Sequence, residues 1–156
     1  MGFSFTGFIV VIVLLLPNIL FAGFPPKNVP EGLKDTNILL TAMERVGQIG
    51  FIIIPILSKL YFMDKGPTFA LGVMIFSAAV YYGLWIRYFT GGREYSLLVE
   101  PVAAIPIPMA VFPIIYMLFA AIWSQHVWLG AAAVIFAAGH CANSWNSYKQ
   151  SKAAGK

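Results

Sequence analysis

Polar side chains recur at helical spacing inside long apolar segments of this sequence, and they are its main candidates for chemistry. Glu44 and Gln48 lie four residues apart in one such segment. His140, Asn143 and Ser144 share one helical face of another. A carboxyl, an amide or an imidazole is unfavourable in lipid and usually faces a protein interior or a wet cavity. These residues therefore indicate a binding site or an acid–base pair inside a membrane.

Two other apolar segments carry polar groups that we place at a similar depth. Asn18 lies in the first segment, and Tyr81 lies on a polar and aromatic stripe of the third that also carries Ser77, Trp85 and Tyr88. Polar groups from four segments at one depth predict a shared pocket in the cytoplasmic half of the bilayer. We expect this ligand-binding pocket to be lined by Asn18, Glu44, Gln48, Tyr81, His140, Asn143 and Ser144. Interhelical hydrogen bonds that only hold the helices together would give the same pattern, and this alternative stays open.

Glu44 also has simpler explanations. Thr41 with Glu44 matches the capping box S/T-x-x-E, which would begin a helix near Thr41 and make Glu44 part of its cap. Otherwise the Glu44 carboxylate needs a cation, which we expect Arg87 or Arg93 to supply. Glu100 would then hold the remaining arginine.

The sequence offers no recognisable metal or haem site. His126 and His140 would lie about 21 Å apart along one helix, so they cannot hold one haem between them. No cluster of His, Cys and carboxylate residues has the spacing of zinc ligands. Cys141 is the single cysteine and is interpreted as a packing residue. We therefore predict no metal ligand, and the sequence indicates no particular cofactor. Taken alone, His140 is most simply an interior histidine that bonds to a neighbouring helix.

The composition places these residues in a membrane. The chain has 156 residues, of which 60% are hydrophobic and only 10% charged, with a mean hydropathy of +0.81. A soluble domain has about a quarter of its residues charged. Because a helix needs roughly 20 apolar residues to cross a bilayer, we predict an all-α transmembrane bundle that forms one membrane domain over 1–156. Its five expected spans are about 3–24, 37–62, 68–88, 101–123 and 127–148.

Prolines and small residues distinguish the last two expected spans. The fourth carries Pro101, Pro106, Pro108 and Pro113. We expect the last three of these prolines to bend the helix and open room beside the pocket. The fifth is rich in glycine and alanine, so we expect it to lie centrally in the bundle or to mediate a homo-oligomer.

Lysines and arginines are divided unevenly between the expected loops. Lys59 and Lys65 fall on one side of the membrane, and the remaining basic residues fall on the other. Because cytoplasmic loops carry the basic excess, we expect the N-terminus outside and the C-terminus in the cytoplasm, in a bacterial plasma membrane. The formal charge of +4 is not gathered on one helix or patch. The expected partner is therefore the lipid bilayer, and no nucleic-acid partner is expected.

Three functions fit this pattern. A pocket facing the cytoplasm favours binding or transport of a small, partly apolar or amphipathic molecule, which we rank first. A structural or regulatory subunit of a membrane complex would also use a polar face and a small-residue face. An intramembrane enzyme acting on a lipid-like substrate would use Glu44 and His140 as acid and base, which requires the two side chains to meet. Whether the chain is an enzyme is left open.

Overall fold

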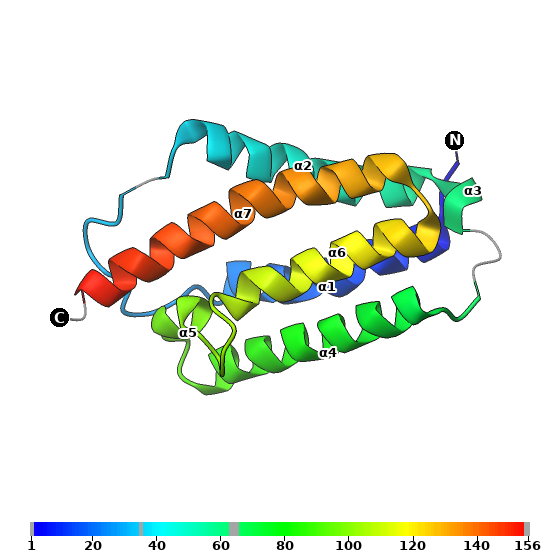
Figure 1. The fold of residues 1–156 in the computed structure, drawn as a ribbon. Coiled ribbons are helices and arrows are strands. Elements are labelled where there is room, and N and C mark those ends of the chain that lie inside the picture. The colour runs from blue at the N-terminus through cyan, green and yellow to red at the C-terminus, as the bar shows by residue number, and fades with distance from the viewer. Residues whose placement is uncertain (1, 35, 63–65, 155–156) are drawn as a thin grey trace.

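The computed structural model describes residues 2–34, 36–62 and 66–154 as a bundle of helices that run along one another (Figure 1). The described residues contain no β-strand, only isolated bridges. The predicted all-α bundle is therefore confirmed. Its helices are α1 (Phe5–Gly23), α2 (Ile38–Leu57), α3 (Lys59–Phe62), α4 (Phe69–Thr90), α5 (Ser96–Val99), α6 (Pro108–Ser124) and α7 (Val127–Ala154).

Four helices, α1, α2, α4 and α7, are long and apolar enough to cross a membrane. The fifth, α6, has 17 residues. At 1.5 Å per residue it is about 26 Å long, slightly less than the roughly 30 Å hydrocarbon core. It runs beside the long helices and contacts both α4 and α7 (Figure 1). The architecture is thus that of a helical membrane protein with four long helices and one shorter helix.

The start of α2 corrects one interpretation of Glu44. Asn37 caps this helix, because its side-chain oxygen accepts a hydrogen bond from the Leu39 N–H at 2.8 Å. Thr41 therefore lies inside α2, and the predicted capping box between Thr41 and Glu44 is wrong. Glu44 is an interior residue of α2, available to neighbouring helices.

The other bounds differ from the expected spans at their ends. The segment expected at 37–62 is interrupted at Ser58, and the one-turn helix α3 follows. The third long helix continues to Thr90, and the last continues to Ala154. The last helix is longer than a bilayer requires, so its basic final turns extend beyond the hydrophobic core.

The prolines of the fourth expected span act differently from the prediction. The helix begins at Pro108, after an irregular segment in which Ile107 has the left-handed φ of 44°. Pro106 precedes the helix, and Pro108 occupies its first turn, where the missing N–H has no helical partner to lose. Only Pro113 lies inside α6. The span predicted from residue 101 is therefore shorter, and a kink at all three prolines is wrong.

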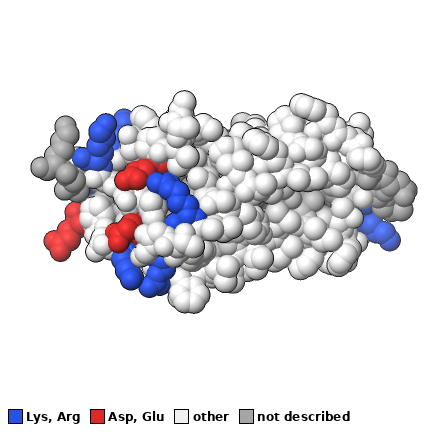
Figure 2. Space-filling view, turned by 90° about the horizontal axis from the view of Figure 1, so that it is seen from below, with Lys and Arg blue, Asp and Glu red and all other residues white. Residues whose placement is uncertain are grey.

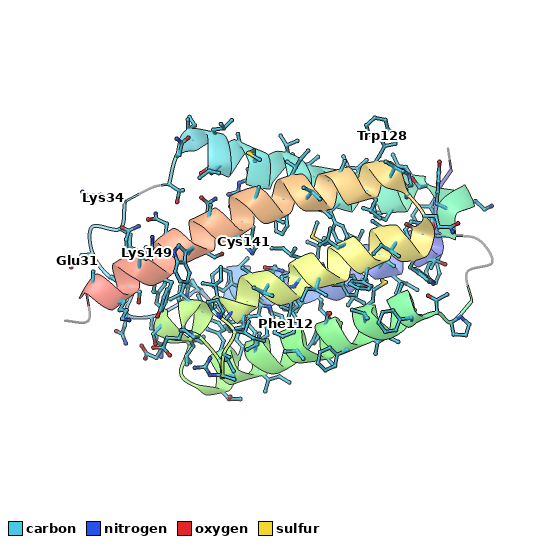
Figure 3. The ribbon with its side chains drawn as sticks, viewed as in Figure 1. Glu31, Lys34, Phe112, Trp128, Cys141 and Lys149 are labelled. Carbon is cyan, nitrogen blue, oxygen red and sulfur yellow. The ribbon has the colours of Figure 1, made fainter. Side chains whose placement is uncertain are left out.

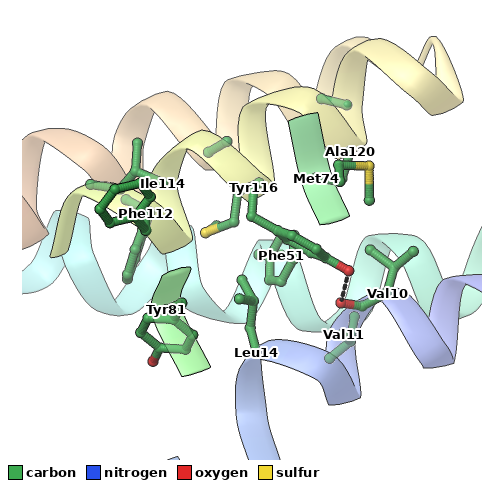
Figure 4. Packing of buried hydrophobic residues seen from close by; sticks show 14 of the residues in the cluster. Val10, Val11, Leu14, Phe51, Met74, Tyr81, Phe112, Ile114, Tyr116 and Ala120 are labelled. Carbon is green, nitrogen blue, oxygen red and sulfur yellow. Dashed lines mark hydrogen bonds between the residues drawn. The ribbon is translucent and has the colours of Figure 1, made fainter. Parts of the chain in front are cut away.

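The centre of the bundle is an apolar core fastened by a few buried hydroxyl groups. Figure 4 shows Tyr116 of α6 reaching α1, where its hydroxyl donates a hydrogen bond to the Val10 carbonyl at 3.1 Å. Leu14 and Phe51 are buried in the same cluster. Tyr82 of α4 donates in the same way to the Val13 carbonyl at 2.8 Å, which has no donor within α1 because Pro17 lacks an N–H.

The charged residues gather at one end of the bundle. Figure 2 shows acidic and basic side chains crowded there, with an uncharged body between this end and the other. Glu31, Lys34 and Lys149 lie at this end, by the final turns of α7, whereas Trp128 lies toward the opposite end (Figure 3). Lys65 and Lys156, which also entered the expected charge division, fall outside the described residues. We call the first end the charged end.

Candidate functional site

Glu44 on α2 and two residues of α7 form a hydrogen-bonded group. His140 Nδ1 lies 2.7 Å from Glu44 Oε1. The Asn143 amide nitrogen donates to the second carboxylate oxygen, Oε2. Both Glu44 oxygens are therefore held by α7, and about three quarters of the Glu44 and His140 side-chain surfaces are covered. The requirement that Glu44 and His140 meet is satisfied.

The contact assigns the tautomer of the imidazole. An ionised carboxylate can only accept, so His140 Nδ1 carries the hydrogen and donates it to Glu44. In the neutral ring Nε2 then keeps its lone pair, and no described residue bonds to it. The Phe136 ring stacks on the imidazole, with centroids 4.6 Å apart and planes at 21°. The carboxylate and the aromatic ring together orient His140.

Glycines allow the two helices to approach closely enough for these bonds. A Cβ added to Gly139 would come within 2.4 Å of the Leu40 carbonyl oxygen and 2.5 Å of the Glu44 nitrogen. A Cβ added to Gly47 would meet the Phe136 nitrogen at 2.4 Å. The small residues of α7 thus serve an intramolecular contact with α2. An additional role in a homo-oligomer stays a prediction.

A second polar contact joins α1 to α4 beside this group. Asn18 Nδ2 donates to the Tyr81 hydroxyl at 3.0 Å and to the Leu14 carbonyl at 2.7 Å. Tyr81 is buried, as are the other residues of the stripe predicted on α4, Ser77, Trp85 and Tyr88. The stripe faces the bundle interior.

Two adjoining cavities lie around these polar groups. One, of about 300 Å³, is nearer the charged end, and we call it the upper cavity. The other, of about 350 Å³, lies deeper, and we call it the lower cavity. The walls shared by both cavities are Asn18, Phe21, Glu44, Tyr81 and His140.

The structure brings the predicted site residues together along these cavities. Six line the upper cavity, namely Asn18, Glu44, Tyr81, His140, Asn143 and Ser144. Gln48 lines only the lower cavity. Asn37 and Thr41, which share the helical stripe of Glu44, are exposed and line neither. Whether the gathered residues bind a ligand stays a prediction.

The predicted arginine partners of Glu44 are wrong. Arg87 pairs with Glu100, at 3.5 Å between Nη2 and Oε2. The Arg93 guanidinium lies over the Phe24 ring, 5.8 Å from its centroid. Arg87 lies in the last turn of α4 and Arg93 follows the end of that helix, whereas Glu44 is reached by α7 instead. The pairing of Glu100 with one arginine is confirmed.

Several cavity residues escaped sequence reasoning. Tyr95 and the α5 residues Leu98 and Val99 close the upper cavity, together with Met109 and Ala110 at the start of α6. A four-residue helix in a connecting segment leaves no periodic signal in the sequence. Arg45 lines the lower cavity, although its position beside Glu44 could have indicated this.

A larger hollow, of about 770 Å³, lies among the connecting segments at the charged end. Two of its three carboxylates have partners there: Glu94 accepts from Asn28 at 2.7 Å, and Glu100 pairs with Arg87. Within the described residues, no three His, Cys, Asp or Glu side chains are grouped in a way that could hold a metal ion.

Comparison with protein-family models, with curated protein sequences and with solved structures finds no match to this chain.

Proposed function

We propose that this protein binds a small, partly apolar molecule in the two cavities around Glu44 and His140. The carrying observation is the hydrogen-bonded group of Glu44, His140 and Asn143 on the walls of these cavities. A carboxylate and an imidazole inside a membrane indicate a functional site, because apolar residues would hold two helices together at lower cost.

The cavity walls support this proposal through their mixed character. The lower cavity combines polar groups with the apolar side chains of Leu14, Phe51, Met117 and Phe136. Small-molecule sites are typically mostly apolar with a few placed polar groups, and they start at about 300 Å³. Both cavities reach this size.

The positions of the cavities support access from the cytoplasm. The upper cavity adjoins the charged end, which carries most of the described lysines and arginines. By the distribution of basic residues, this end faces the cytoplasm. In this orientation the ligand would be taken from, or released to, the cytoplasmic side or the inner leaflet.

Equilibrium binding of simple amphiphiles tests the proposal. Protein in lipid nanodiscs is incubated with tritiated decanol, decanoate or decylamine, and binding to empty discs is subtracted. We expect saturable binding of at least one probe, which Asn18→Phe abolishes by filling the shared wall of the cavities. Ile19→Phe is the matched control, because Ile19 is 58% exposed on the outer face of the same helix. If no probe binds saturably, or if both variants behave alike, the proposal is wrong.

A second function, an intramembrane enzyme, is favoured by the 2.7 Å contact between Glu44 and His140. A carboxylate that holds Nδ1–H leaves Nε2 free to take a proton from a substrate and return it. The substrate would be lipid-like, since the cavities lie within the bundle. Mass spectrometry of a lipid extract incubated with the protein tests this function. A product formed by the native chain and absent with His140→Gln supports it, and an unchanged extract opposes it.

A further inference from the structure

We propose that the ligand is an anionic single-chain amphiphile whose charged head pairs with Arg45 at the mouth of the lower cavity. This inference rests on the proposed function and adds the chemical class of the ligand. Arg45 was not among the residues predicted from the sequence to form the site.

Unlike the other described arginines, Arg45 has no partner in direct contact, and its charge acts only at longer range on the adjacent Glu44 carboxylate. It makes no ion pair within 4.0 Å and no hydrogen bond with any residue that the structure describes. Its neighbour Glu44 cannot readily turn to it, because His140 and Asn143 hold both carboxylate oxygens. The guanidinium is thus left available for an anion from outside the chain.

The depth of Arg45 makes an available cation unusual. It lies seven residues beyond the first residue of α2, about 10 Å along the helix axis. A charge at this depth is unfavourable in lipid unless it reaches the headgroups or meets a counter-charge. A guanidinium binds a carboxylate through two parallel hydrogen bonds, which suits an anionic head.

The mouth of the lower cavity lies between α1 and α2. Asn18 and Arg45 both line this cavity, and both are exposed. The two helices touch closely at their other ends, where a Cβ added to Gly7 would meet the Pro55 carbonyl oxygen at 2.0 Å. Because exposed residues of two neighbouring helices border the cavity here, we place the entry of the amphiphile between α1 and α2.

The wall behind Arg45 suits a hydrocarbon chain. Gln48 follows Arg45 along α2 and adds an amide at the polar side. Beyond it lie apolar side chains from α1, α2, α6 and α7, which are Leu14, Leu15, Phe51, Ile52, Pro113, Met117 and Phe136. A cavity of about 350 Å³ admits one short chain and excludes the two acyl chains of a phospholipid. We therefore assign the anion to a single-chain carboxylate.

The three decyl probes, which differ only in their heads, test this assignment. We expect the native protein to bind decanoate about ten-fold or more tightly than decanol, the ratio that a charge-assisted hydrogen-bond pair supplies. Arg45→Gln should remove this preference, so that the ratio of decanoate to decanol affinity falls to about one. Arg45→Lys should restore part of it. Arg93→Gln is the matched control, because Arg93 lies over Phe24 and lines neither cavity.

The outcomes separate this inference from the proposed function. Equal binding of decanoate and decanol, or a preference for decylamine, would overturn the anionic assignment and leave the binding pocket standing. Loss of saturable binding for all probes would remove the pocket as well. A phospholipid that stays bound to the purified native protein in native mass spectrometry, but not to Arg45→Gln, would assign Arg45 to a membrane lipid and overturn the single-chain carboxylate. Circular dichroism establishes that Arg45→Gln is folded.

Discussion

Glu44 and His140 are 96 residues apart in the chain, and yet the carboxylate of one lies 2.7 Å from the imidazole of the other. The contact joins α2 to α7 beside Gly139, whose lack of a side chain lets the two backbones approach closely. It is the centre of the polar site.

Replacing Glu44 should weaken the fold and the site together. Glu44→Leu removes the acceptor of both the His140 ring and the Asn143 amide, leaving two donors without partners. We expect a loss of about 1–3 kcal/mol in the free energy of unfolding. Thermal unfolding followed by circular dichroism measures it, with Glu31→Leu as control, since Glu31 is exposed. If Glu44→Leu changes neither stability nor probe binding, the carboxylate has no role here.

The close approach of α2 and α7 should depend on Gly139. Gly139→Ala places a methyl group within 2.4 Å of the Leu40 carbonyl oxygen, which forces the helices apart. We expect a destabilisation of about 1–3 kcal/mol. In Gly83→Ala the new methyl group meets no atom within 4 Å, and alanine should stabilise α4 by up to about 1 kcal/mol. Equal unfolding temperatures for the two variants would show that the helices are not held this closely.

His126 lies at the end opposite the charged end, and we expect it to make the stability of the protein depend on pH. It lies between α6 and α7, where its Nδ1 accepts from the Leu129 N–H at 3.4 Å and its Nε2 lies 3.0 Å from the Ser58 hydroxyl. Nδ1 thus caps α7, and a proton there would remove the acceptor and place a cation at the positive end of the helix. Burial lowers the pKa of His126 below its ordinary value.

The sign of this effect follows from the lowered pKa. The unfolded chain takes up the proton near pH 6.5, whereas the folded chain resists it until a lower pH. Stability from His126 is therefore complete above about pH 6.5 and is lost as the pH falls toward the folded pKa. We expect a loss of about 1 kcal/mol, the usual contribution of a helix cap. His126→Asn keeps a capping acceptor without titrating, so its unfolding temperature should vary less between pH 7.5 and 5. Identical pH profiles for the two proteins would contradict the prediction.

The charged end should face the cytoplasm. In a Cys141→Ala background, Ser151→Cys places a thiol on the last turns of α7, and Lys59→Cys places one in α3 at the other end. Because basic residues are retained on the cytoplasmic side, an impermeant maleimide should label Lys59→Cys in intact cells and spare Ser151→Cys. Labelling of both after permeabilisation is the control. The reverse pattern in intact cells would invert the orientation.

The sequence alone predicted the elements that depend on local composition. Apolar runs of about 20 residues give helices in lipid whatever surrounds them, because no water is present to satisfy an open backbone. The bundle, four of its long helices and the polar faces around Glu44, Tyr81 and His140 could therefore be predicted. The ends of the helices were harder to predict where one residue was compatible with two local structures. Pro108 could bend a helix or begin one, and Thr41 could cap a helix or lie inside it.

Contacts between helices depended on the tertiary structure. A helical stripe specifies a face but not its neighbour, so Glu44 could have paired with an arginine as readily as with His140. The close approach at Gly139 and the alignment of α2 with α7 determined that choice. The availability of Arg45 has the same origin, because α7 binds the adjacent carboxylate and leaves the guanidinium at the mouth of the lower cavity. Such pairings join residues about a hundred positions apart, and they exist only once the helices are packed.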